Sequence, residues 1–298
     1  MSKLSKTNKI MFLISCILLI VALVIWYLSI YGFVDKVKKT DLDANKSVIT
    51  DESKEKNIEN ILLLGVDKQE NVSDTIIVAS LRRDIKSVKF ISIMRDTYVY
   101  QGEGKANKIN YAYNYGGVEG SVATVNQVFN LDISKYVKVS FEELVKIVDY
   151  IGGVEVDINN DEKNIINKIC NINIDKAGKV NLNGEQSLAY SRIRSIDSDY
   201  KRTERQRNLM ISILIKAKNL SALDYPKIIL ELASCTETNL TTFEIMSLST
   251  IITDMDLNNI GRFRIPVDGT TSDNTDGVYH LDWNEEINKN ALHDYIYN

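Results

Sequence analysis

Short apolar runs alternate, from Asn60 onward, with segments whose apolar residues recur at helical spacing. The short runs are typical of buried strands, and they cover Ile61–Val66, Thr75–Leu81, Val88–Met94, Tyr136–Val139 and Val154–Ile158. Helical spacing covers Val118–Phe129, Phe141–Ile151, a long segment that ends near Asn219, and two segments near Pro226–Ser234 and Thr242–Thr253. Strands that are apolar on both faces need helices on both sides. The pattern therefore predicts an α/β fold, a three-layer α/β/α domain around a mixed central sheet.

The chain ahead of this domain contains a long uncharged segment, Ile10–Val34. It exceeds the ~20 residues that a helix needs to cross a bilayer. Trp26, Tyr27 and Tyr31 lie at its C-terminal end, where interfacial aromatic residues belong. A cleavable signal peptide would have a shorter apolar region of about 7–15 residues. We therefore expect an uncleaved transmembrane helix over residues 10–34.

This helix divides the chain into regions that we expect to behave differently. Residues 1–9 would be a short cytoplasmic tail, 35–59 a polar spacer, 60–220 the catalytic core, and 221–298 a helical extension packed on the same domain. Lysines lie on both sides of the helix, but aspartates dilute the second group. The positive-inside rule therefore favours, by a small margin, an extracytoplasmic C-terminal domain on a single-pass protein of the cell membrane.

Composition limits the chemistry that the domain can perform. The net charge of -4 argues against a general affinity for nucleic acid. The only histidines, His280 and His293, lie near the C-terminus, which excludes Ser-His-Asp or Cys-His catalysis in the body of the domain. Cys170 and Cys235 are either a disulfide pair or two thiols. The remaining groups are carboxylates, arginines and hydroxyls, with or without a hard metal ion.

Two carboxylates flank the turn between the first two predicted strands. Asp67 closes one strand and Asp74 opens the next, so a hairpin brings both to one end of the sheet. Mg²⁺ is often held by one or two carboxylates together with substrate phosphates, and Mn²⁺ is the alternative ion. A structural interpretation remains open, in which Asp74 caps the turn and Asp67 is an ordinary loop carboxylate.

A second polar group follows the third predicted strand, where Arg95 and Asp96 come directly after an apolar run. An exposed ion pair at a strand end would also explain these two residues. Lys108 follows, near three tyrosines that could either contact sugar rings or cover the sheet: Tyr111, Tyr113 and Tyr115.

The segment from Tyr190 to Arg207 concentrates positive charge in an acidic chain. Its six cations are Arg192, Arg194, Lys201, Arg202, Arg205 and Arg207. Tyr190–Arg194 is predicted to be another short strand. If Ala189–Arg194 is extended, Arg192 and Arg194 share one face. In the helix that follows, Arg202 and Gln206 begin a stripe that continues through Leu209, Ile213, Ala217 and Leu220. Arginines beside an apolar stripe match the shape of a polyisoprenyl diphosphate.

Three structural interpretations of this segment stay open at this point. The apolar stripe could be ordinary core. Thr203–Gln206 also fits a capping box, which would give Gln206 a structural role. Glu204 could pair with neighbouring arginines on a solvated charged helix.

Six motifs together make the chain resemble the LytR-CpsA-Psr family over about Asn60–Lys218. They occur in the family's order: NILLLGVD with SDT, SIMRDTYV, KINYAYNYGG, YIGGVEVDI, LNGEQSLAYSRIR and DYKRTERQR. The resemblance implies a phosphotransferase on the outer face of a Gram-positive cell membrane. It would move a glycopolymer, of teichoic acid or capsular polysaccharide type, from undecaprenyl diphosphate to a peptidoglycan hydroxyl.

The resemblance also implies roles for individual residues. Asp67 and Asp74 would bind Mg²⁺, and a cationic and polar set would bind the diphosphate: Arg95, Lys108, Arg192, Arg194, Arg202 and Gln206. Asp96 would be the general base or would orient Arg95. Asp74, Arg95 and Asp96 form the expected catalytic group. The chain departs from the family at Val72, where many members have arginine, and at Met94, where proline is usual.

Three other functions compete with transfer. A binder would hold the lipid-linked polymer without turning it over, and the missing arginine at Val72 favours it. A hydrolase would use water in place of peptidoglycan. A regulator that binds nucleic acid through the basic segment is disfavoured by the predicted membrane anchor and by the acidic net charge.

Overall fold

The computed structural model describes residues 57–101, 106–220, 235–256, 260–275 and 277–298. The predicted transmembrane helix, the tail and nearly all of the spacer lie outside these residues. So does the predicted helix near Pro226–Ser234. Among the described residues, no helix is both long and apolar enough to cross a bilayer.

A six-stranded mixed sheet forms the centre of the fold, in the order β10-β3-β2-β1-β6-β9. Its strands are β1 (Ile58–Asp67), β2 (Val72–Arg82), β3 (Ser87–Ile93), β6 (Lys135–Ser140), β9 (Glu237–Thr238) and β10 (Ile260–Ile265). β1, β2 and β3 form an antiparallel meander, whereas β6 joins β1 and β10 joins β3 in parallel. The mixed sheet predicted from the sequence is therefore confirmed.

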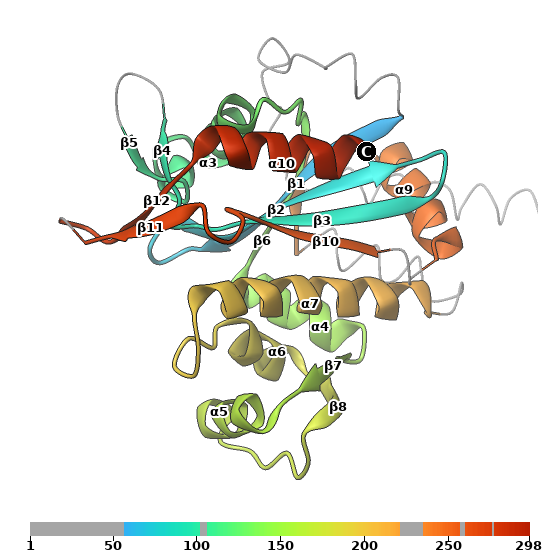
Figure 1. The fold of residues 1–298 in the computed structure, drawn as a ribbon. Coiled ribbons are helices and arrows are strands. Elements are labelled where there is room, and N and C mark those ends of the chain that lie inside the picture. Colours follow the sequence, from blue (N-terminus) through green and yellow to red (C-terminus); the bar gives the residue numbers. More distant parts are fainter. Residues whose placement is uncertain (1–56, 102–105, 221–234, 257–259, 276) are drawn as a thin grey trace, which may run out of the picture.

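Helices cover both faces of this sheet, as the apolar runs require (Figure 1). On one face lie α3 (Tyr111–Phe129) and α10 (Glu285–Tyr297). Their apolar side chains pack with one side of each central strand, for example Leu62 and Ile91. On the other face lie α4 (Phe141–Tyr150), α7 (Asp199–Lys218) and α9 (Thr242–Asp254). Ile211 and Ile251 pack there against Ile77 from β2.

A smaller body, which packs around a separate apolar cluster, lies below α7 in Figure 1. It contains β7 (Val154–Ile158), α5 (Asn160–Cys170), β8 (Gly178–Leu182) and α6 (Gly184–Ser191). The predicted strand Val154–Ile158 exists, but it pairs with β8 in a separate hairpin and does not join the central sheet. Cys170 is a free thiol, so the two C-terminal cysteines form no disulfide.

The expected strand over Tyr190–Arg194 is wrong, because this segment ends a helix. Asn183 accepts from the backbone amide of Gln186, and the Gln186 side chain accepts from the amide of Asn183. This capping box starts α6, which continues until Arg192 caps it. The Thr203–Gln206 capping box is also wrong, since α7 already begins at Asp199.

The C-terminal part of the chain is less helical than expected. It contains α9 and α10, but β10 adds an edge to the central sheet and β11 (Thr271–Asn274) pairs with β12 (His280–Trp283). A second small hairpin is formed by β4 (Tyr98–Tyr100) and β5 (Ala106–Lys108). An isolated β-bridge between Thr97 and Leu281 joins it to the β11–β12 hairpin. These two hairpins border the end of the sheet where the polar residues gather.

Candidate functional site

A bulge in β2 places the first carboxylate of the site. Gly65 pairs with Thr75 and Val66 pairs with Ser73, which leaves Asp74 as the extra residue. A bulge re-aims the side chain that it carries, and here Asp74 forms a buried ion pair with Arg95. Gly65 allows the close approach, because a Cβ there would lie 2.9 Å from the Cβ of Thr75.

Backbone hydrogen bonds from the C-terminal strands fix the position of Arg95 and Asp96. The amide of Met94 donates to the carbonyl of Ile265 (2.9 Å), and the amide of Leu281 donates to the carbonyl of Asp96 (2.8 Å). Burial opposes the charge of Arg95, but the carboxylates of Asp74 and Asp96 outweigh it and raise its pKa. Arg95 therefore stays cationic in a half-buried position.

Lys108 extends the cluster from β5. Its Nζ donates to Oδ1 of Asp96 at 2.9 Å and lies 5.6 Å from the ring centre of Tyr279. Burial, the hydrogen bond to Asp273 and the charge of Asp96 all raise the pKa of Tyr279. The Tyr279 hydroxyl therefore stays protonated at neutral pH, next to the cations.

Arg202 is the most unusual side chain of the site. It is 2% exposed, and its Nη2 donates to Oδ2 of Asp199 at 2.7 Å. Its Nε and Nη1 are buried and have no hydrogen-bond partner among the described residues. Burial lowers the pKa of Arg202 to about 10, and the charges of Arg95 and Arg194 add to the effect. Buried donors are rarely left unsatisfied in a folded protein, so this guanidinium can accept an anionic ligand.

Asp199 and Tyr279 belong to the site although the sequence did not single them out. Asp199 is one helical turn before Arg202, a spacing that already indicates an ion pair. Burial raises the pKa of Asp199, although Arg202 and Arg95 oppose the shift. Tyr279 lies in the C-terminal region, which carried no usable motif.

Arg192 and Arg194 are exposed at the end of α6, on the loop that precedes α7. The charge of Arg194 acts on both Arg202 and Asp199. Arg192 lies over the ring of Phe141, with its Cζ 4.7 Å from the ring centre, and borders a cavity of about 370 Å³ with Asp67. Arg194 is therefore close enough to affect the Arg202–Asp199 pair, whereas the contacts of Arg192 are with Phe141 and the cavity that Asp67 borders.

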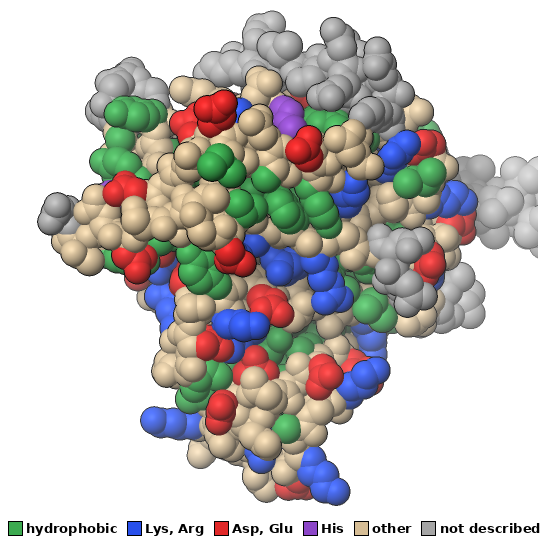
Figure 2. Space-filling model, in the orientation of Figure 1, with side chains coloured by type: hydrophobic (Ala, Val, Ile, Leu, Met, Phe, Trp, Pro, Cys, Tyr) green, Lys and Arg blue, Asp and Glu red, His purple; other side chains and the backbone are tan. Residues whose placement is uncertain are grey.

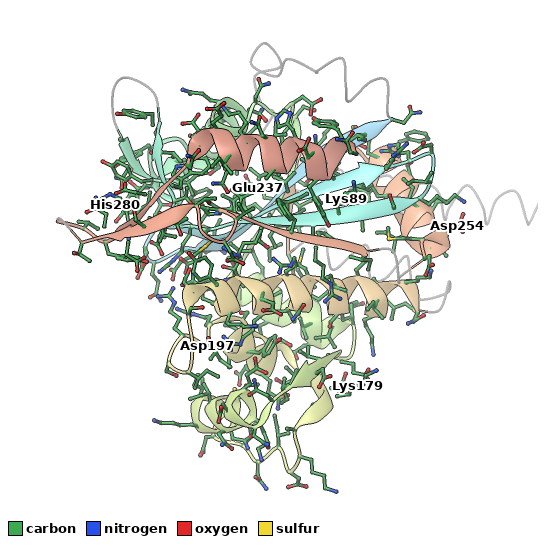
Figure 3. All side chains as sticks on the ribbon, in the orientation of Figure 1. Lys89, Lys179, Asp197, Glu237, Asp254 and His280 are labelled. Carbon is green, nitrogen blue, oxygen red and sulfur yellow. The ribbon has the colours of Figure 1, made fainter. Side chains whose placement is uncertain are left out.

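Arg205 and Arg207 are buried and donate hydrogen bonds to other parts of the fold. Arg205 donates to Glu162 at 2.7 Å, to the carbonyl of Ile193 at 3.2 Å and to Asp197, which ties the loop after α6 to α5. Figure 3 shows Asp197 in this loop. Arg207 is buried and donates to Ser92 Oγ at 2.9 Å.

Further arginines lie on β10, next to α7. Figure 2 shows cationic side chains gathered between β10 and α7, with carboxylates among them. Arg264 stacks on the ring of Tyr200 at 4.2 Å, and Arg262 donates to Oδ1 of Asn208 at 3.4 Å. The sequence gave these two residues no role.

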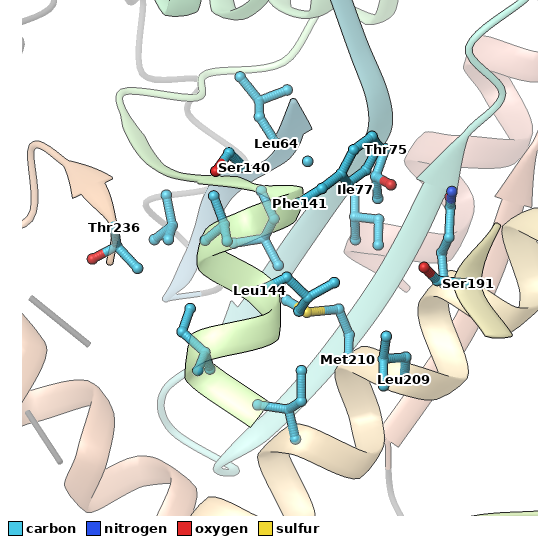
Figure 4. Close-up of a pocket in the computed structure, with 17 residues that line it drawn as sticks. Leu64, Thr75, Ile77, Ser140, Phe141, Leu144, Ser191, Leu209, Met210 and Thr236 are labelled. Atoms are coloured by element: carbon cyan, nitrogen blue, oxygen red, sulfur yellow. The ribbon is translucent and has the colours of Figure 1, made fainter. Parts of the chain in front are cut away.

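An apolar cavity of about 220 Å³ lies between the sheet and helices α4 and α7 (Figure 4). Leu63 and Ile77 line it from the sheet, and Leu144 and Met210 line it from the helices. Gln206 also lines the cavity, one helical turn after Arg202. Leu209 and Ile213 of the predicted stripe line the cavity, and together with Leu220 they also pack in the core of the smaller body.

The two carboxylates assigned to a metal have different partners. Oδ1 of Asp67 accepts from the amides of Gln69 (2.8 Å) and Glu70 (3.2 Å), so Asp67 caps the turn that had been assigned to Asp74. Oδ1 of Asp74 accepts a hydrogen bond from Nη1 of Arg95. No group of three or more His, Cys, Asp or Glu side chains suited to a metal occurs among the described residues. Oδ2 of each aspartate nevertheless suits Mg²⁺, which needs few protein ligands when phosphates supply the others.

Comparisons with known proteins found a matching family, similar sequences and similar folds. The model of the LytR_cpsA_psr family matches residues 24–293. The chain is 35% identical to the polyisoprenyl-teichoic acid–peptidoglycan teichoic acid transferase TagU of Bacillus mycoides, over 83% of this chain and 80% of the relative.

Two solved structures share the fold. TagT bound to LIIa-WTA superposes with a TM-score of 0.71 at 27% identity, over 86% of this chain and 99% of TagT. TagV of B. subtilis superposes with a TM-score of 0.66 at 28% identity, over 81% and 98% of the two chains.

Proposed function

The chain belongs to the LytR-CpsA-Psr family, and we propose that it transfers a glycopolymer from an undecaprenyl diphosphate carrier to peptidoglycan. The observation that carries the proposal is Arg202, whose buried guanidinium has two unused donors beside the end of an apolar cavity. The TagU relative is named for the same kind of transfer.

The diphosphate of the carrier would bind between Arg95 and Arg202. A guanidinium donates two parallel hydrogen bonds to a phosphate, and such charge-assisted bonds are about twice as strong as neutral ones. Nε and Nη1 of Arg202, which have no partner among the described residues, lie on different edges of the guanidinium, so each would donate to a different phosphate oxygen. Arg194, Arg192 and Lys108 would add positive charge around the bound anion.

The isoprenoid chain of the carrier would occupy the apolar cavity between the sheet and α7. Gln206 lines this cavity, and Arg202 precedes it by one turn on the same helix face. An anionic head at Arg202 therefore leads directly to an apolar tail. Burying the tail removes apolar surface from water at about 25 cal/mol per Å².

Transfer needs no covalent bond to the protein. A peptidoglycan hydroxyl attacks the phosphorus that carries the glycopolymer, a new phosphodiester forms, and the bond to the lipid phosphate breaks. The lipid monophosphate leaves with the bonding electrons, and the hydroxyl proton passes to a base. Catalysis of such a step is mostly positioning and charge stabilisation, which the arginines supply.

Asp96 remains the candidate for that base. Its ion pairs with Lys108 (2.9 Å) and Arg95 (3.5 Å) also support a role in holding Arg95 in place. Asp67 and Asp74 would hold Mg²⁺, or Mn²⁺ in its place, against the diphosphate. The ion would neutralise negative charge on the phosphates.

The donor lipid resides in a membrane, so we further propose that residues 10–34 anchor the chain there. The described domain would then face the outside of the cell, where peptidoglycan is available.

The test uses the full-length chain in detergent with a lipid diphosphate-linked saccharide, Mg²⁺ and peptidoglycan. We expect lipid monophosphate release together with labelling of peptidoglycan, and we expect EDTA or Asp74→Ala to abolish both. The matched control is Asp157→Ala, which removes an exposed carboxylate from the distant β7–β8 hairpin. Release without labelling would identify a hydrolase, and binding without release would identify a carrier.

A further inference from the structure

A second groove lies between β4, β12 and α3, near the charged cluster of Arg95, Asp96 and Lys108. It has a volume of about 370 Å³, and its polar and aromatic lining comprises Tyr98, Tyr100, Gln127, Asp282, Trp283 and Glu285. We propose that this groove binds the glycan strand of the acceptor. The inference rests on the proposed transfer function.

The chemistry of the lining suits a sugar polymer. Aromatic faces pack against the apolar faces of sugar rings, while amide and carboxylate groups hydrogen-bond to hydroxyls. Tyr100 is 67% exposed although its neighbour Val99 is buried in the core. Gln127, Asp282 and Glu285 supply polar groups within the same groove.

Two aromatic side chains of the groove, Tyr98 and Trp283, are held in fixed positions. Tyr98 stacks on His280 with ring centres 4.1 Å apart. Trp283 donates from Nε1 to the carbonyl of Tyr98 at 2.8 Å, and its ring contacts Phe129 with centres 5.5 Å apart. A rigid aromatic surface binds a ligand with a smaller loss of side-chain entropy.

The groove is connected to this charged cluster through the backbone. Leu281, in β12, donates to the carbonyl of Asp96. Tyr279 lies against Lys108 in the cluster, whereas the next residue, His280, stacks on Tyr98 of the groove. Figure 3 shows His280 at this end of the molecule. A glycan in the groove would therefore lie close to the reacting phosphate.

The direction of attack identifies the acceptor as the occupant. In phosphoryl-type transfer the attacking and leaving oxygens lie roughly in line on opposite sides of the phosphorus. With the lipid in the apolar cavity, as proposed above, the leaving lipid phosphate would point toward the α4 and α7 side of the sheet. The groove instead adjoins the α3 and α10 side, where Val128 and Trp283 pack (Figure 1). The donor saccharide stays bonded to the phosphorus, so the hydroxyl that arrives from the far side belongs to the acceptor.

The test compares Tyr100→Ala and Gln127→Ala with wild type in the full-length chain. We expect each change to raise the acceptor KM about tenfold, with the donor KM and kcat within twofold of wild type. Tyr100→Phe should restore the acceptor KM, because stacking needs the ring and not the hydroxyl. Calorimetry with a GlcNAc–MurNAc tetrasaccharide, without donor, should show the same order of affinities.

Phe243→Ala is the matched control, since it removes an 80% exposed aromatic from α9 at the opposite end of the sheet (Figure 1). It should leave the acceptor KM unchanged. Normal acceptor KM and normal tetrasaccharide affinity in both groove variants would overturn the proposal. Tetrasaccharide binding by a wild-type chain that transfers nothing would instead refute the transfer function and leave the groove standing.

Discussion

At the residue scale, two arginines on α7 differ in how many of their donor nitrogens the fold uses. Arg205 uses all of its donor nitrogens, on Glu162, Asp197 and a backbone carbonyl. Arg202 uses only Nη2, on Asp199. Both are buried cations three residues apart, and charge alone does not separate them, although the family motif already singles out Arg202. The unsatisfied donors of Arg202 support the proposal that it binds the diphosphate.

Arg202→Lys should reduce kcat/KM by about 100-fold or more, because lysine cannot make the paired hydrogen bonds of a guanidinium. Inorganic pyrophosphate should raise the Tm of wild type but not of this variant, which differential scanning fluorimetry measures. Lys201→Ala, at an exposed position on the same helix, serves as the control and should behave like wild type. Full activity in Arg202→Lys would show that the donors serve no phosphate.

Asp199 makes stability depend on pH. Its pKa is raised in the fold, mainly by burial, so its protonated form favours the folded state. Its contribution to stability is present below the ordinary aspartate pKa and is lost as pH rises through the raised value. Asp199→Asn should therefore have a higher Tm than wild type at pH 7, with the difference shrinking below about pH 4. A lower Tm at pH 7 would contradict this assignment.

At the element scale, local patterns predict the strands β1, β2, β3 and β6 and the helices α4, α7 and α9 well. They are strongly apolar or periodic, and burial on both sides fixes them. The strand predicted for Tyr190–Arg194 is wrong, because a capping box that begins at Asn183, seven residues before Tyr190, starts a helix there. The paired hydrogen bonds of Asn183 and Gln186 start a helix that outlasts the short apolar pattern.

The loop between α6 and α7 depends on Arg205. Arg205→Met leaves the carboxylates of Glu162 and Asp197 without their cation, and Glu162 is mostly buried. Losing one partner of a buried pair costs about 3–5 kcal/mol. We expect a loss of that order in the free energy of unfolding by urea, whereas Lys201→Met should change it by less than about 0.5 kcal/mol. An unchanged midpoint in Arg205→Met would refute the role of this ion-pair network.

The cavity between the sheet and α4 should select for lipid length. Leu144→Trp places a larger side chain into the cavity wall. We expect the KM for a donor with a long polyprenyl chain to rise about tenfold, while a donor with a very short chain changes little. Steady-state kinetics with the two donors measures the difference. Equal effects on both donors would show that the chain binds elsewhere.

At the scale of the whole molecule, the site is assembled from segments that are distant in sequence. Asp74, Arg95 and Lys108 come from the first half of the domain, Asp199 and Arg202 from α7, and Tyr279 from the C-terminus. The sequence identified most of these residues through their charge and their family motifs. It missed the C-terminal part, because the parallel pairing of β10 with β3 and the bond from Leu281 to Asp96 are long-range contacts without a local pattern.

The fold also explains why the C-terminal region matters for the site. Ile265 and Leu281 hold the backbone on either side of Arg95. The expected boundary near residue 220 therefore separates parts of one structural unit. The carboxylates assigned to the metal, Asp67 and Asp74, remain a prediction that rests on the family resemblance and on their spare oxygens.

A donor with a radioactive phosphate separates phosphotransfer from glycosyl transfer. The full-length chain is given a donor whose saccharide-linked phosphate carries ³²P, together with peptidoglycan. We expect the label to enter peptidoglycan along with the saccharide, since the bond broken lies between the two phosphates. Saccharide in peptidoglycan with the label left on lipid diphosphate would mean glycosyl transfer, and would refute phosphotransfer.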